Sequence, residues 1–495
     1  MPGGRALLLV TLTVQIAVSG GRAFGAIYNV PPDPDPRVLT TGDLLTLSDG
    51  GLLGDDFLAI GATMNIGGGT VGDRLRADDS AVTVTGGAIG SDASFVDGAT
   101  LHLLGGAIGN QTQIGQGGTA IIDGGSIGTH FDVAQGGTLH FNGGILTGVM
   151  TLTGGNGYLT GGVIDGNLGI EEGGVLEMTG GDVKSRLFMD RGTFNMVDGT
   201  LTSSVSIFYD STVNVTGGTI LGSISGSGGE VNISGGSVGL VSTRNNTAIT
   251  VTGGRVFHAN IGDRGTFQQT GGFVERLTIG GGSSVHLADV SLGTVTTDGF
   301  VSRTPPEALL ENVTLANDVV ARVGGVVHMI GGKVAGELNA TRTGRIYLSK
   351  TTVAGRSSIT SDGYVLLDAD ARLGNVSMER GGHLEVADGA ISGQVDIYSG
   401  SMLTVHGGSV ANGLRSIGSV LSIRGGTLGD GYVITDGSSV QVSAGTLGKE
   451  WILSGGSTME FTGGSVGPRF FLMDGTLKVS GGTVAQGFSY LLTAC

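Results

Sequence analysis

A pair of glycines recurs every 18 or 19 residues along most of the chain, and no other feature constrains the fold as strongly. Each pair follows a stretch of alternating apolar and polar residues, as in VTVTGG (82–87), LHLLGG (101–106) and LHFNGG (139–144). The first glycine of the pair stands at positions 86, 105, 124, 143, 161, 180, 217, 235, 253 and 271. Degenerate units keep this spacing farther along, so about 24 units span residues 49–484.

The apolar residues within each unit predict short strands. Positions four and two before the glycine pair are apolar, as at Leu101 and Leu103, whereas His102 between them is polar. This alternation with a period of two is typical of a strand with one buried face. An aliphatic column follows three residues after the first glycine, and a third apolar cluster follows that column, so each unit is predicted to hold two or three strands. The aliphatic column includes Ile89, Ile108 and Ile127.

A unit of 18 residues cannot bury its own apolar side chains, but stacked units bury them in continuous columns. The predicted fold class is therefore all-β, a parallel β-helix (β-solenoid) of about 24 coils of 18–19 residues. Apolar side chains paired at i and i+2 favour a right-handed helix. Aliphatic residues six apart are also typical of left-handed β-helices, so that alternative stays open.

Composition excludes several other classes of protein. Gly accounts for 99 of the 495 residues, but only 8 are Pro, which is too few for a collagen triple helix. With 39% hydrophobic residues the chain can bury a core, which disfavours disorder, and glycine suits sharp turns because it adopts positive φ without steric cost. The net charge of −16 disfavours binding to nucleic acid or to anionic membrane surfaces.

The ends of the sequence predict export. Residues 1–25 have the charged start, apolar centre and small-residue cleavage site of a signal peptide. We expect a Pro-containing lead-in and N-terminal cap over residues 26–48, one solenoid over 49–484 with a loop insertion near 298–307, and a short apolar tail over 485–495. The mature chain is expected to be secreted or to lie at the cell surface, with no transmembrane span.

Two further expectations concern the C-terminal end. Cys495 is the only cysteine, so an intrachain disulfide is excluded. Solenoids normally end in a polar capping unit, and none is visible after Val484, which predicts end-to-end self-association.

Together the signal peptide and the degenerate Gly-Gly coils over residues 49–484 resemble the passenger regions of bacterial autotransporter-type and haemagglutinin-type adhesins. The resemblance implies surface display and adhesion, with surface glycans or other cell-surface proteins as partners. One departure is that only 11 residues follow Val484, too few for the membrane barrel that ends an autotransporter. Polysaccharide lyases and hydrolases with parallel β-helices are similar in shape, so a glycan-active enzyme is the alternative function.

Four groups of outward residues are candidate site residues. His102 and His140 lie two coils apart, too far to share a metal, and are expected to be surface side chains. Asn195, Asn214 and Asn232 predict a structural amide ladder on successive coils. The densest charged group is Glu171, Glu172, Glu177, Asp182, Lys184, Arg186, Asp190 and Arg191. The threonines that raise an ice-binding interpretation are Thr83, Thr85, Thr216, Thr250 and Thr252.

None of these groups forms a recognisable catalytic or ligand motif. Paired carboxylates near an arginine suit acid–base chemistry on a glycan, but mixed charges at solvated turns explain the same residues more simply. His, Tyr, Glu and Asn interrupt the threonine columns, which argues against ordering of ice. We therefore expect no catalytic residue, no metal and no cofactor, and a function in structure or adhesion.

Overall fold

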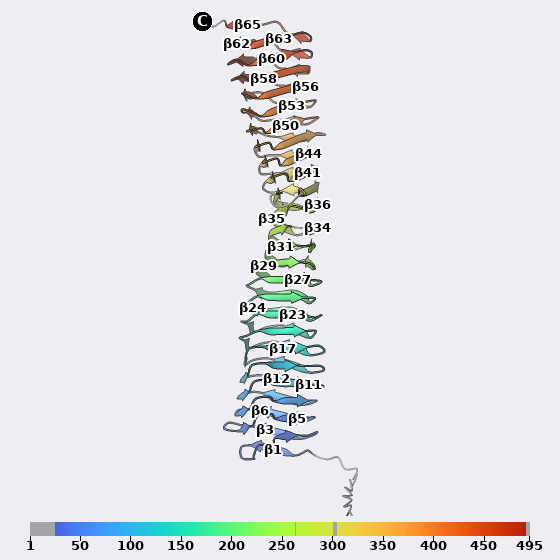
Figure 1. Cartoon of the computed structure of the whole chain (residues 1–495), viewed down its shortest axis with the longest axis vertical. Helices are drawn as coiled ribbons and strands as arrows, with labels where there is room; N and C mark the ends of the chain where they lie inside the picture. Colours follow the sequence, from blue (N-terminus) through green and yellow to red (C-terminus); the bar gives the residue numbers. More distant parts are fainter. Residues whose placement is uncertain (1–24, 263, 300–303, 492–495) are drawn as a thin grey trace, which may run out of the picture.

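The computed structural model describes residues 25–262, 264–299 and 304–491. Every regular element in these ranges is a β-strand, and the strands stack as a parallel β-solenoid of about 24 turns. Figure 1 shows the result as a long, narrow rod in which the chain advances coil by coil from one end to the other. With neighbouring strands about 4.8 Å apart, the rod is on the order of 115 Å long. The predicted fold class is confirmed, and the handedness stays a prediction.

A well-formed coil consists of three short strands separated by turns. In one such coil β12 (Thr100–Leu103) precedes the double glycine, β13 (Ala107–Ile108) follows it, and β14 (Thr112–Ile114) closes the coil. The next coil begins with β15 (Thr119–Ile122), which pairs in parallel with β12. We refer to these three positions as the first, second and third strand of a coil.

Some coils fuse two of these strands into one. β24 (Val175–Val183) runs from the first strand through the glycine turn into the second, with register shifts at the turn. β29 (Thr219–Ser227) instead joins the second strand to the third. The fused strands preserve the parallel register on either side, so the coil keeps its outline although the strand boundaries move.

The interior of the rod is a stack of aliphatic columns. Ile89, Ile108 and Ile127 pair directly in register on three successive coils, and each is at most 2% exposed. The third apolar cluster, including Phe131 and Val133, is likewise buried. The inward residues were therefore predicted correctly. Because each coil covers the apolar side chains of its neighbours, the core runs through the whole stack.

The double glycine recurs because the coils approach one another too closely at this turn for a side chain. Gly106 has a φ of +79°, and a Cβ atom there would lie 2.5 Å from the carbonyl oxygen of Gly87 on the preceding coil. Gly105 lacks a positive φ, but its Cβ would lie 2.7 Å from the carbonyl oxygen of Thr85. Thus the second glycine is required by conformation and space together, and the first by space alone.

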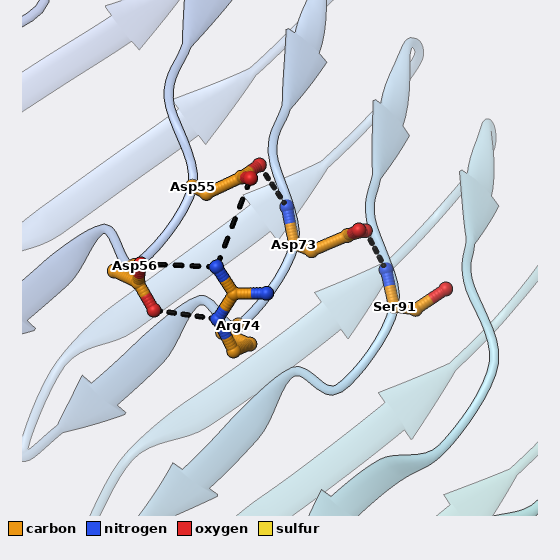
Figure 2. Close-up of polar contacts among 5 residues, drawn as sticks. All are labelled: Asp55, Asp56, Asp73, Arg74 and Ser91. Atoms are coloured by element: carbon orange, nitrogen blue, oxygen red, sulfur yellow. Dashed lines mark hydrogen bonds and ion pairs between the residues drawn. The ribbon is translucent and has the colours of Figure 1, made fainter.

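The turn between the second and third strands is held by short polar side chains. Asp55 Oδ1 accepts a hydrogen bond from the backbone N–H of Asp73, 3.0 Å away, and Asp73 Oδ1 accepts one from Ser91 at 2.7 Å (Figure 2). Arg74 bridges the carboxylates of Asp56 and Asp55 beside this turn. The same contact to the following coil recurs at Asn110, Asp318, Asn375, Asn412 and Asp430. Each side chain thereby satisfies a turn N–H that the strands leave unpaired.

The ladder begins earlier than expected. β1 (Ile27–Val30) pairs in parallel with β3 (Leu44–Leu47), so the segment 26–48 forms a coil rather than an extended lead-in. The prolines at 31–36 are tolerated because they lie in the connection between β1 and β2 (Val38–Leu39), outside the paired strands. The predicted signal peptide, apart from Gly25, lies outside the described residues.

The spacing is longest between β36 (Ser284–Ala288) and β38 (Glu307–Glu311), whose paired residues are 23 apart. The extra length lies after β37 (Ser291–Asp298), in a connection of which residues 300–303 are outside the described ranges. Near the other end, β65 (Phe488–Leu491) pairs with β62 (Phe470–Met473). The segment expected to be a tail thus continues the ladder through residue 491.

The stacked isoleucine column predicts a strong dependence on apolar character. Ile108→Asp should lower the free energy of unfolding by several kcal/mol, since it buries a carboxylate among apolar side chains. Ala107→Asp is the matched control, because the adjacent side chain points outward and is half-exposed. Thermal and denaturant unfolding of both variants checks this, and equal stability of the two would contradict the assigned orientation.

The glycine turn predicts that space matters in addition to conformation. Gly106 and Gly413 share a φ of +79°, but a Cβ at Gly413 would have no atom within 4 Å. Gly413→Ala should therefore cost about 1 kcal/mol of left-handed strain alone. Gly106→Ala should lower the melting temperature markedly more, because it also clashes with the preceding coil. A Gly106→Ala variant no less stable than Gly413→Ala would refute the close approach.

Candidate functional site

The outward side chains of the first strands form the surface with the most chemical variety, which we call the polar face. Each first strand contributes outward residues at alternate positions, and the parallel register aligns them in columns along the rod. The central column in the N-terminal half contains Thr83, His102, Ile121, His140, Tyr158 and Glu177 in that order. A side chain on this face therefore contacts residues 18–19 positions away in sequence.

The predicted histidines lie on this face, and each has a partner. His102 Nε2 lies 2.6 Å from Asp123 Oδ2 on the next coil, and Asn142 Nδ2 donates to Asp123 Oδ1 at 2.8 Å. These hydrogen bonds lower the pKa of the Asp123 carboxyl, with His102 the larger cause. The ring of His140 stacks on Tyr158, with centroids 4.9 Å apart. The two histidines thus serve separate contacts and share no site.

The asparagine ladder is confirmed. Asn214 Nδ2 donates to Asn195 Oδ1 at 2.8 Å, and Asn232 Nδ2 donates to Asn214 Oδ1 at 3.0 Å. The three side chains are half-buried, and their amides satisfy one another along the rod. Such a ladder stabilises the stack and presents no convergent groups to a ligand.

In the C-terminal half, the polar face contains a cluster of rings that the sequence analysis missed. It comprises His328 on β41 (Val326–Ile330), Tyr347 on β44 (Arg345–Ser349), Tyr364 on β47 (Tyr364–Asp368) and His383 on β50 (His383–Val386). These four residues, which we call the aromatic patch, come from four successive coils. Each ring contacts the next one along the rod.

The geometry of the aromatic patch changes along the rod. The rings of His328 and Tyr347 stack, with centroids 4.5 Å apart and planes 7° apart. Tyr347 and Tyr364 are tilted at 5.8 Å, and Tyr364 meets His383 edge to face at 5.2 Å. All four side chains are half-buried, so part of each ring faces solvent.

Glu385 fixes one side of the aromatic patch. Its Oε2 accepts a hydrogen bond of 2.6 Å from the Tyr364 hydroxyl, and its Oε1 lies 3.1 Å from His406 Nε2. Burial, followed by this hydrogen bond, raises the pKa of Tyr364 above its ordinary value. Burial lowers the pKa of His383, which favours its neutral form. The patch therefore presents uncharged rings held in place by a carboxylate.

A surface groove of about 610 Å³ adjoins the patch. Tyr347, Tyr364 and His383 line it together with the charged side chains of Arg345 and Asp362. Its volume lies within the range typical of small-ligand sites. Other hollows on the rod, such as one of about 430 Å³ at turn residues 392–394 and 411–413, are lined by small or uncharged polar residues. The groove beside the aromatic patch is thus the best candidate for a specific site.

The charged group around residues 171–191 does not converge on one place. Glu177 points out of the polar face between Tyr158 and Asn195, whereas Asp182 lies on the far side of the glycine turn. Asp190 pairs with its neighbour Arg191 at 3.3 Å. Within the described ranges, no group of three or more His, Cys, Asp or Glu side chains is arranged to hold a metal ion.

The aromatic patch has a sequence signal that was available. Arg345, Tyr364 and His383 are spaced by 19 residues, as are His328 and Tyr347. The Gly-Gly pair is absent from the units of Tyr347 and Tyr364, so the register of these residues could not be read from the glycines.

No protein-family model matches the chain, and no curated protein matches it. No helix in the described part of the chain is long and apolar enough to cross a membrane.

The His102–Asp123 pair predicts a measurable titration. In His102→Ala the pKa of Asp123 should rise toward the ordinary aspartate value, because the main group that stabilises its charged form is gone. The stabilisation from this pair should be present above the ordinary pKa and be lost as pH falls through the lowered one. Carbon-13 NMR of the carboxyl group checks this. His140→Ala is the control and should leave the Asp123 titration unchanged.

Proposed function

We propose that this chain is a secreted or cell-surface structural and adhesive rod that acts by binding through its polar face rather than by catalysis. The observation that carries the proposal is the aligned columns of outward side chains, which repeat across successive coils in register. A ligand that contacts several coils at once gains affinity from many weak contacts. The predicted signal peptide and the resemblance to adhesin passenger regions support the location.

The chemistry of the face also supports binding over reaction. Its histidines and asparagines interact with neighbouring coils, and its carboxylates are spread along the rod. An enzyme acting on a polysaccharide needs two carboxyl groups that face one bond, and Glu177 and Asp182 lie on different sides of a turn.

An adhesion assay tests the proposal. Beads coated with the chain should be retained under flow on at least one film among neutral polysaccharide, sulfated polysaccharide and extracellular-matrix protein. The Cys495→Ser background permits polymer attachment at introduced cysteines. Attachment on the polar face should reduce retention, using Thr83→Cys, Thr250→Cys and Ser422→Cys. Attachment beside the glycine turn is the matched control, using Ser126→Cys, Ser237→Cys and Ser409→Cys.

Two results would contradict the proposal. One is retention no greater than that of albumin-coated beads on every film. The other is release of oligosaccharides from a polysaccharide, abolished by Glu177→Gln or Asp182→Asn, which would establish the enzyme instead.

A further inference from the structure

We propose that the aromatic patch and its groove form a carbohydrate-binding site for a neutral polysaccharide that lies along the rod. This inference rests on the proposed binding function of the polar face, and it assigns that function a place and a ligand class.

The first argument is the continuity of the ring surface. Four rings on four successive coils contact one another in sequence, so the aromatic surface extends over three coil spacings, about 14 Å. Each sugar unit has an apolar face of C–H groups that packs against an aromatic ring, while its hydroxyls remain at the edges. A chain of sugars placed along the rod can thus contact several rings in succession.

The second argument is the polar rim of the groove. Thr343, Arg345 and Asp362 line it beside the rings and supply hydroxyl, guanidinium and carboxylate groups. These groups donate to and accept from sugar hydroxyls. Arg345 and Asp362 carry opposite charges, so the lining is balanced and favours an uncharged ligand over a sulfated or phosphorylated one.

The third argument is rigidity. The hydrogen bond from Tyr364 to Glu385 and the stacking of Tyr347 on His328 hold both tyrosine rings before any ligand arrives. A ligand therefore loses less free energy to ordering of side chains at this site.

Other ligand classes fit the same surface poorly. A peptide cannot add as a strand here, because β44 and β47 are already paired on both sides. Stacked bases of a single-stranded nucleic acid would bring phosphates toward Asp362 and Glu385 on a chain of net charge −16. A neutral sugar polymer avoids both conflicts.

The test measures binding of the full chain to soluble glucan, mannan, galactan and xylan, with a sulfated polysaccharide as the charged comparison. Affinity electrophoresis and calorimetry should show binding to at least one neutral polymer. Tyr347→Ala and Tyr364→Ala should each weaken it about tenfold, as expected for loss of a central aromatic contact. Tyr347→Trp should retain binding, since it keeps an aromatic face.

Tyr158→Ala is the matched control. Tyr158 lies in the same kind of outward column and stacks on a histidine at 4.9 Å and 10°, as Tyr347 does at 4.5 Å and 7°. It lies outside the groove, so its loss should leave affinity unchanged. Thermal unfolding of each variant establishes that the rod is intact.

Three results would overturn the inference: no binding to any neutral polymer, equal loss in Tyr158→Ala and Tyr347→Ala, or preference for the sulfated polymer. Dimers that dissociate in Tyr364→Ala would assign the patch to a second copy of the chain instead. Soluble-polymer binding at the patch without retention of coated beads would support this site while contradicting the adhesive role. Retention that survives Tyr347→Ala and Tyr364→Ala would do the reverse.

Discussion

The hydrogen-bonded ladder between coils is the interaction on which the rest of this structure depends. Each strand pairs with the equivalent strand one repeat away, so neighbouring coils must stay at strand spacing around their whole circumference. That single distance aligns the inward aliphatic side chains into columns and the outward side chains into rows. The core, the polar ladders and the aromatic patch are all consequences of the same register.

Close stacking also determines which residues can occupy the turns. At the double glycine, the backbone of one coil passes within van der Waals contact of the next, and any Cβ would meet a carbonyl group. At the following turn there is room for a short side chain, and Asp or Asn uses it to bind the backbone of the next coil. The unusual glycine content is therefore a direct result of coil spacing.

The sequence predicted those parts of the structure that repeat with the glycine pair. The inward columns at Ile108 and Phe131 and the amide ladder at Asn214 follow from counting residues relative to Gly-Gly. The coil before residue 49 was missed because prolines replace glycines in its turn. The aromatic patch was missed for a related reason, since Tyr347 and Tyr364 lie in units without the pair. Contacts between coils require an exact register, and degenerate units do not supply it.

The ladder has a mechanical consequence. Its hydrogen bonds join one coil to the next and so lie along the axis of the rod. Tension applied to the two ends loads the bonds of the terminal coil first, because every coil is held only by its neighbours. Such a rod should yield one coil at a time, and each coil of 18–19 residues would release about 60 Å of extended chain. A molecule built this way limits the force it transmits and lengthens in steps instead of rupturing at once.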